Sequence, residues 1–235
     1  MSSYYRDKWS LMQQGDISED GIMHLARQIA HSFLDYYLKD CRYEEDYITL
    51  LCEMTTCSDE TRLTNPATFA LFNIIIESLC DDFEELHTET YNRVMSQVIS
   101  YCRGVDGGSE LDTRLREFGL NTCDDIFLRA QSLRSAVRAI RPGTKVSKVL
   151  ILSRVTIGAD IAITSVVIQR MQKAFPEAAP VLIGSGKLRE VYGGNEWLNI
   201  REVPYSRRGG LLQRLDSWHY VLQIISEETE GLSAE

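Results

Sequence analysis

A cluster of polar and flexible residues directly follows a short apolar run in the second half of the chain. Its members lie within eight positions and are Ser153, Arg154, Thr156, Gly158 and Asp160. Backbone N–H groups at a helix start bind phosphate or sugar oxygens, which makes Thr156 and Gly158 candidate ligand-binding residues. Arg154 either pairs with an anionic ligand or extends into solvent. Asp160 fits the first turn of a helix, where the dipole favours negative charge, so one interpretation is a capping carboxylate.

A strand, a glycine-containing loop and a helix must position this cluster. The run at 149–152 is apolar throughout, which is typical of a strand covered on both faces. Residues 159–174 predict a helix that is apolar on nearly every face as far as Ile168. Thr164 within this helix either packs there or contacts a substrate. Together these elements form the first half of a βαβ unit, whose chemistry gathers at the carboxyl end of the strand.

The remainder of the second half repeats the alternation of strand and helix. We expect strands at 180–184 and 199–203, and helices at 187–192 and 211–225. This order predicts a parallel, right-handed, Rossmann-like sheet, which three strands leave incomplete. The glycines after the second strand match neither the P-loop nor the dinucleotide spacing. After the third strand, Arg207 and Arg208 either contact an anionic acceptor or lie in a solvated loop.

The first half shows helical periodicity and no strand signal. The predicted helices cover 3–14, 18–40, 43–56, 66–101 and 122–140. Asn65 and Pro66 predict a helix start, as N-cap and first helical residue. Thr122 and Asp125 form a capping box. The predicted fold class is therefore α + α/β, with an all-helical domain over 1–143 and a Rossmann-like half-domain over 144–235.

Composition limits the partners. The 235 residues carry a net charge of −9, divided into −11 through Ile140 and +2 beyond it, so the acidic first half disfavours nucleic acid. The six cysteines form no CxxC pair and no zinc-finger spacing, so we expect neither a metal site nor a cofactor. No apolar run is long enough to span a membrane, and the first residues lack the apolar core of a signal peptide. A cytoplasmic protein is the resulting expectation.

Several segments resemble a known family. SRVTIGADIAITS, then RMQKAFPEAAPVLIGSGK and NIREVPY, are similar to the start of glycosyltransferase family 9, the ADP-heptose:lipopolysaccharide heptosyltransferases. The resemblance covers roughly 146–225, and it departs from the family pattern at Ala159, an extra residue between Gly158 and Asp160, and at Val166, where a proline is usual. An extra residue inside the helix would rotate Asp160 by about 100°, whereas an extra residue in the loop would leave its orientation unchanged.

The resemblance implies an inverting enzyme of the two-domain GT-B class. It makes Asp160 the general base that takes a proton from the acceptor hydroxyl, and it implies a nucleotide sugar as donor and a glycan or glycolipid as acceptor. A glycolipid acceptor also implies peripheral contact with a membrane surface. In the family the nucleotide-sugar half follows the region where this chain stops. The resemblance therefore predicts an acceptor-side, amino-terminal fragment that transfers no sugar by itself.

Two other functions remain open from the sequence. One is a non-catalytic α/β binding or protein-interaction module, whose helical part docks a partner. The other is a Rossmann oxidoreductase, which is the weaker choice because no GxGxxG follows the first strand.

Overall fold

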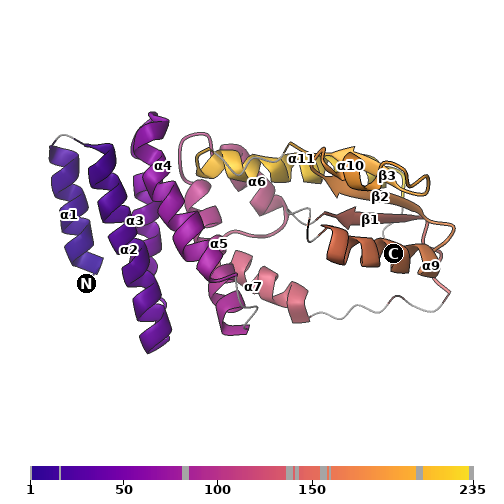
Figure 1. Ribbon diagram of the computed structural model, residues 1–235, viewed down its shortest axis with the longest axis horizontal. Coiled ribbons are helices and arrows are strands. Elements are labelled where there is room, and N and C mark those ends of the chain that lie inside the picture. The colour runs from indigo at the N-terminus through magenta and orange to yellow at the C-terminus, as the bar shows by residue number, and fades with distance from the viewer. Residues whose placement is uncertain are drawn as a thin grey trace. The chain divides into compact units, whose positions relative to one another are not determined.

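The computed structural model describes residues 2–15, 17–80, 85–135, 140, 143–153, 158, 160–204 and 209–232. The chain divides into two compact units, Met1–Val137 with Gly209–Leu212, and Arg138–Arg208 with Gln213–Glu235 (Figure 1). In the described ranges, helices precede residue 148 and a parallel sheet with its helices follows it. The predicted fold class, α + α/β with a partial Rossmann-like sheet, is confirmed.

The first unit packs its helices around a core of aromatic and aliphatic side chains. Its described elements are α1 (Ser2–Gln14), α2 (Glu19–Asp40), α3 (Glu45–Thr55), α4 (Thr61–Phe69), the π-helix η1 (Ala70–Ile76), α5 (Glu85–Cys102), α6 (Ser109–Glu117) and α7 (Cys123–Ser135). The core includes Trp9, Phe33, Tyr47, Leu51 and Leu71, all nearly inaccessible to solvent.

Local sequence signals explain two of these helix starts. The Ser18 hydroxyl accepts a hydrogen bond from the Gly21 amide and so caps α2. Thr122 and Asp125 bond reciprocally before α7, each side chain to the other's backbone N–H, at 3.1 and 2.8 Å. The predicted capping box is confirmed.

The predicted helix start at Asn65 and Pro66 is wrong. The first turn of α4 closes on the carbonyl of Glu60, so α4 begins at Thr61 and Pro66 lies inside it. Proline is favoured at the first helical position, whereas inside a helix it removes one backbone hydrogen bond and crowds the carbonyl of residue i−4, so its usual position did not predict α4. The predicted continuous helix over 66–101 is also interrupted, because a turn follows η1 before residue 81. Sequence periodicity did not predict α6.

The second unit contains three parallel strands in the order β1–β2–β3 (Figure 1). They are β1 (Lys148–Leu152), β2 (Ala179–Gly184) and β3 (Asn199–Glu202). Its helices are the π-helix η2 (Asp160–Thr164), α9 (Ser165–Ala174), α10 (Leu188–Tyr192) and α11 (Leu211–Thr229). Leu150 pairs with Val181, and Leu182 pairs with Ile200. All three strands lie within a few residues of their predicted bounds.

Alternate residues of the strands build two apolar layers. On one face Ile151, Leu182 and Ile200 pack with Ile168 of α9 and Tyr192 of α10. This common face is expected, because right-handed crossovers between strands in chain order place their helices on the same side. On the other face, the residues that pack together are Leu150, Val181, Ile183 and Val203 from the sheet region with Val221, Ile224 and Ile225 of α11.

The helix after β1 is less buried than predicted. Ile168 faces the sheet, but Ile161, Ile163, Val166 and Val167 are between 37% and 55% exposed. The expectation of a helix buried on nearly every face is therefore wrong. Apolar residues around a helix are buried only where another element packs against them. The sheet covers one side of this helix, so the apolar residues on its other sides are exposed.

Candidate functional site

The buried carboxylate of Asp160 lies beyond the carboxyl end of β1. Ser153, the first residue after the strand, donates its hydroxyl to both carboxylate oxygens, at 3.0 and 2.9 Å. Thr164, one turn further along η2, donates its hydroxyl to Oδ1 at 3.0 Å. Asp160 is only 4% exposed and Thr164 only 3%. Two hydroxyl donors thus fix one orientation of a carboxylate that is almost closed to solvent.

The sheet positions Ser153 at this place. Its backbone N–H donates to the carbonyl of Ile183 at 2.9 Å, which extends the β1–β2 ladder by one bond. Gly184 lies directly against it, because a Cβ added at Gly184 would be 2.5 Å from the Ser153 Cβ and 2.7 Å from Leu188 Cδ1. Real Cβ atoms do not approach this closely, so the position requires glycine. The sequence shows no P-loop spacing at this glycine, and its packing against Ser153 was not predicted.

The Asp160 backbone has its own buried partner. The Tyr192 hydroxyl, at the end of α10, donates to the Asp160 carbonyl at 2.5 Å. Burial, and to a lesser degree the negative charge of Asp160, raise the pKa of Tyr192 above its usual 10.0. The tyrosine therefore stays protonated and remains a hydrogen-bond donor at neutral pH. Sequence reasoning did not identify Tyr192, since its partner is a main-chain atom 32 residues earlier.

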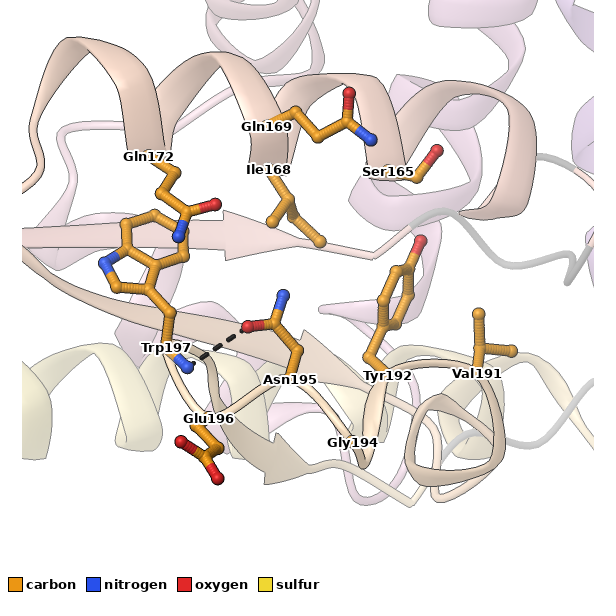
Figure 2. Close-up of a pocket in the computed structure, with 10 residues that line it drawn as sticks. All are labelled: Ser165, Ile168, Gln169, Gln172, Val191, Tyr192, Gly194, Asn195, Glu196 and Trp197. Carbon is orange, nitrogen blue, oxygen red and sulfur yellow. Dashed lines mark hydrogen bonds between the residues drawn. The ribbon is translucent and has the colours of Figure 1, made fainter.

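A pocket opens beside this tyrosine, between α9 and the segment that joins α10 to β3. Its volume is about 790 Å³. Figure 2 shows Ser165, Gln169 and Gln172 on the α9 wall, opposite Tyr192, Asn195 and Trp197. Ile168 is buried at its inner side. The pocket thus has an apolar interior and a rim of hydroxyl and carboxamide groups.

All but one of the polar side chains that line the pocket are neutral. Among the ten described residues that line the pocket, only Glu196 carries a charge. In Figure 2 the Glu196 carboxylate points away from the α9 wall, whereas the Asn195 amide nitrogen points toward it. The Asn195 amide is oriented by its carbonyl oxygen, which accepts a hydrogen bond from the Trp197 backbone N–H at 3.1 Å. The site suits an uncharged polar ligand better than an ion.

Of the predicted site residues, the structure brings Asp160 and Thr164 together. Gly158 is exposed, and a Cβ there would meet no described atom within 4 Å. The other predicted site residues, which are Arg154, Thr156, Arg207 and Arg208, lie outside the described residues. Ser153 entered the predicted cluster but not the predicted site, and its bond to Asp160 is a finding of the structure.

Comparisons with known proteins assign no function to this chain. No family model matches the chain, and no curated protein or solved structure matches it. The described helices include none whose length and apolar character together would suffice for crossing a membrane. Over the same ranges, no three or more histidine, cysteine, aspartate or glutamate residues are grouped as a metal ion requires.

Proposed function

We propose that the α/β unit belongs to a glycosyltransferase, which transfers a heptose or hexose from a nucleotide sugar to a glycan or glycolipid acceptor. The observation that carries this proposal is the carboxylate of Asp160, oriented by Ser153 and Thr164 at the carboxyl end of β1. Ligands of parallel α/β sheets bind at this edge. The resemblance to glycosyltransferase family 9 assigns the general base to the same residue.

In the proposed reaction Asp160 accepts the proton of the acceptor hydroxyl. The acceptor oxygen forms a bond to the anomeric carbon while the bond from that carbon to the nucleotide diphosphate breaks, and the configuration inverts. A base needs a fixed position within hydrogen-bond reach of the proton that it takes. The hydroxyls of Ser153 and Thr164 supply this fixed position.

The π-helical turn that begins at Asp160 supports the assignment. Ala159, the extra residue before it, lies outside the described residues. A π-turn closes its hydrogen bonds over one more residue than an α-turn, and such turns are frequent at functional sites. Asp160–Thr164 forms this wider turn. At the start of this turn the Asp160 carboxylate is directed toward the Ser153 hydroxyl.

One observation favours a second candidate, the non-catalytic α/β binding module. The Asp160 carboxylate is 4% exposed and accepts bonds from two hydroxyls, which is what a structural carboxylate in a protein interior requires. In that case Asp160 joins β1 to η2, and ligand binding occurs without a proton transfer.

The two candidates differ in the effect of Asp160→Asn. Asparagine keeps the shape of the side chain: a hydroxyl beside its carbonyl oxygen can still donate, and a hydroxyl beside its NH₂ group can rotate to accept. For the glycosyltransferase we expect transfer to fall by about 10²- to 10⁴-fold, the usual contribution of a general base, with donor affinity little changed. The assay measures the release of nucleoside diphosphate from a panel of nucleotide sugars. It uses the full-length protein.

A matched control is Asp216→Asn, the same change at an exposed position of α11. It should leave both transfer and stability near the wild-type values. If Asp160→Asn lowers the melting temperature but leaves turnover per folded molecule unchanged, Asp160 is structural and the proposed base is wrong.

A further inference from the structure

The pocket between α9 and the α10–β3 connection is separate from the Asp160 carboxylate. Tyr192 lines the pocket, but its hydroxyl bonds to the Asp160 main-chain carbonyl, not to the carboxylate. We propose that this pocket is a binding site for an uncharged pyranose ring. This inference does not rest on the proposed function, because a binding module without catalysis would use the same site.

The size and the charge of the pocket define the ligand class. About 790 Å³ lies within the range of pockets that hold small molecules. A phosphate or carboxylate ligand calls for arginine, lysine or a cluster of N–H donors. Among the described lining residues there is no lysine or arginine, and the single charge is the carboxylate of Glu196. Anionic ligands, including nucleotides and sugar phosphates, are therefore disfavoured.

The carboxamides of the two walls match the hydroxyl groups of a sugar. Each carboxamide offers an N–H₂ donor group and an acceptor oxygen, and each sugar hydroxyl offers one donor and an acceptor oxygen, so either can donate to or accept from the other. Within the described part of the chain, the exposed side chains of Gln169 and Gln172 have no hydrogen-bond partner, so they are available to a ligand. Asn195 faces them with its amide nitrogen, and its bond from the Trp197 backbone holds it in that orientation.

Apolar surface lies next to these amides. The half-buried Trp197 and the buried Tyr192 and Ile168 line the same pocket. Figure 2 shows Gln172 extending from α9 toward the Trp197 ring. A pyranose ring combines C–H faces with equatorial hydroxyls, and so fits a site in which aromatic and aliphatic surface alternates with amides.

The test uses the complete chain and methyl glycosides of glucose, galactose and mannose as probes. Binding is followed by chemical-shift changes of the side-chain amide protons of Gln169, Gln172 and Asn195, up to about 50 mM sugar, which is well above a millimolar Kd. At least one glycoside should shift these signals saturably. Gln172→Ala and Asn195→Ala should each weaken its affinity by about three- to tenfold, the effect of one lost hydrogen bond.

The control is Gln223→Ala, the same truncation on the exposed face of α11, which should leave affinity unchanged. The inference is overturned if no glycoside shifts the pocket signals, or if glucose 6-phosphate or adenosine binds more tightly than every methyl glycoside. It is also overturned if glycoside binding survives both pocket substitutions.

Discussion

The side chain of Tyr192 and the backbone of Asp160 are joined by a buried hydrogen bond of 2.5 Å between hydroxyl and carbonyl. This bond connects the end of α10 to the first residue of η2, and so relates the sugar pocket that we propose to the carboxylate that we propose as a base. Tyr192 lines the pocket and Asp160 carries the carboxylate, so the bond fixes the pocket and the carboxylate relative to each other.

Removing this hydroxyl should lower stability. Tyr192→Phe leaves the Asp160 carbonyl without this donor, and we expect the free energy of unfolding to fall by about 1 kcal/mol, the net value of one hydrogen bond. Urea denaturation measures the change. Tyr220→Phe, at an exposed tyrosine of α11, is the matched control and should be neutral. Equal stabilities of the two variants would show that the Asp160 carbonyl does not depend on Tyr192.

The contact between Gly184 and Ser153 predicts a larger effect. In Gly184→Ala the new methyl group would lie 2.5 Å from the Ser153 Cβ, so the end of β1 must move. We expect a loss of about 1 to 3 kcal/mol, as in other overpacked interiors, together with a changed Ser153 hydroxyl contact to Asp160. Calorimetric melting measures the first effect.

The control for this change is Gly194→Ala, where an added Cβ meets no described atom within 4 Å. That substitution should be neutral or slightly stabilising, because alanine lowers the entropy of the unfolded chain. A Gly184→Ala protein as stable as Gly194→Ala would contradict the close packing at Ser153.

The sequence was most informative where structure depends on local chemistry. The run at 149–152 became β1, and Thr122 with Asp125 formed the predicted capping box. The expected cover on both faces of this strand is incomplete, because β1 lies at the edge of the sheet and Leu152 is 48% exposed. The position of Asp160 after β1 followed in the same way. These features depend on residues that are close together in the sequence, so they can be recognised from a single sequence.

Features that depend on distant neighbours were not predictable in this way. Tyr192 serves the site through a main-chain carbonyl of η2, and a carbonyl has no sequence signature. Gln172 and Asn195 come together only through the packing of α9 against the α10–β3 connection. The exposure of Ile163 was mispredicted for the same reason, since its surroundings depend on which elements cover that side of the helix.

A cluster of ion pairs predicts how the α/β unit responds to acid. Glu228, near the end of α11, accepts from Lys148 at 2.8 Å and also pairs with Arg201. Arg201 also pairs with Glu227. Hydrogen bonds, from Lys148 to Glu228 and from Arg201 to Glu227, lower the pKa of both carboxyls below their usual 4.5. The stabilisation of the folded state by these ion pairs is therefore complete above pH 4.5 and is lost as the pH falls through the lowered pKa values of the two carboxyls.

Glu228→Gln should reproduce this loss at neutral pH. We expect the variant to be less stable than wild type by about 1 kcal/mol or less at pH 7, because the pair is partly exposed to solvent. The difference should shrink as the pH falls below 4.5 through the lowered pKa of Glu228, because the wild-type carboxyl then becomes protonated. Urea titrations at several pH values measure it, and Glu230→Gln, an exposed neighbour, is the control. A difference that does not shrink at any pH below 4.5 at which the protein remains folded would contradict the assignment.

The hydrogen bond between Thr164 and Asp160 allows a test of whether the carboxylate is structural or catalytic. Thr164→Val replaces the hydroxyl with a methyl group of similar size and removes the 3.0 Å bond to Oδ1. Because the acceptor is a buried carboxylate, we expect the free energy of unfolding to fall by about 1.5 to 3 kcal/mol, whereas Thr229→Val at the exposed end of α11 should cost less.

In an Asp160→Asn background the cost of Thr164→Val should fall by about 1 kcal/mol, and a double-mutant cycle measures this difference as the coupling energy between the two side chains. If Asp160 is the base, Thr164→Val should also lower transfer per folded molecule, because the carboxylate loses a hydroxyl donor that orients it. Strong coupling in stability with unchanged transfer would assign the pair to the fold alone, and additive stabilities would show that the two side chains do not interact.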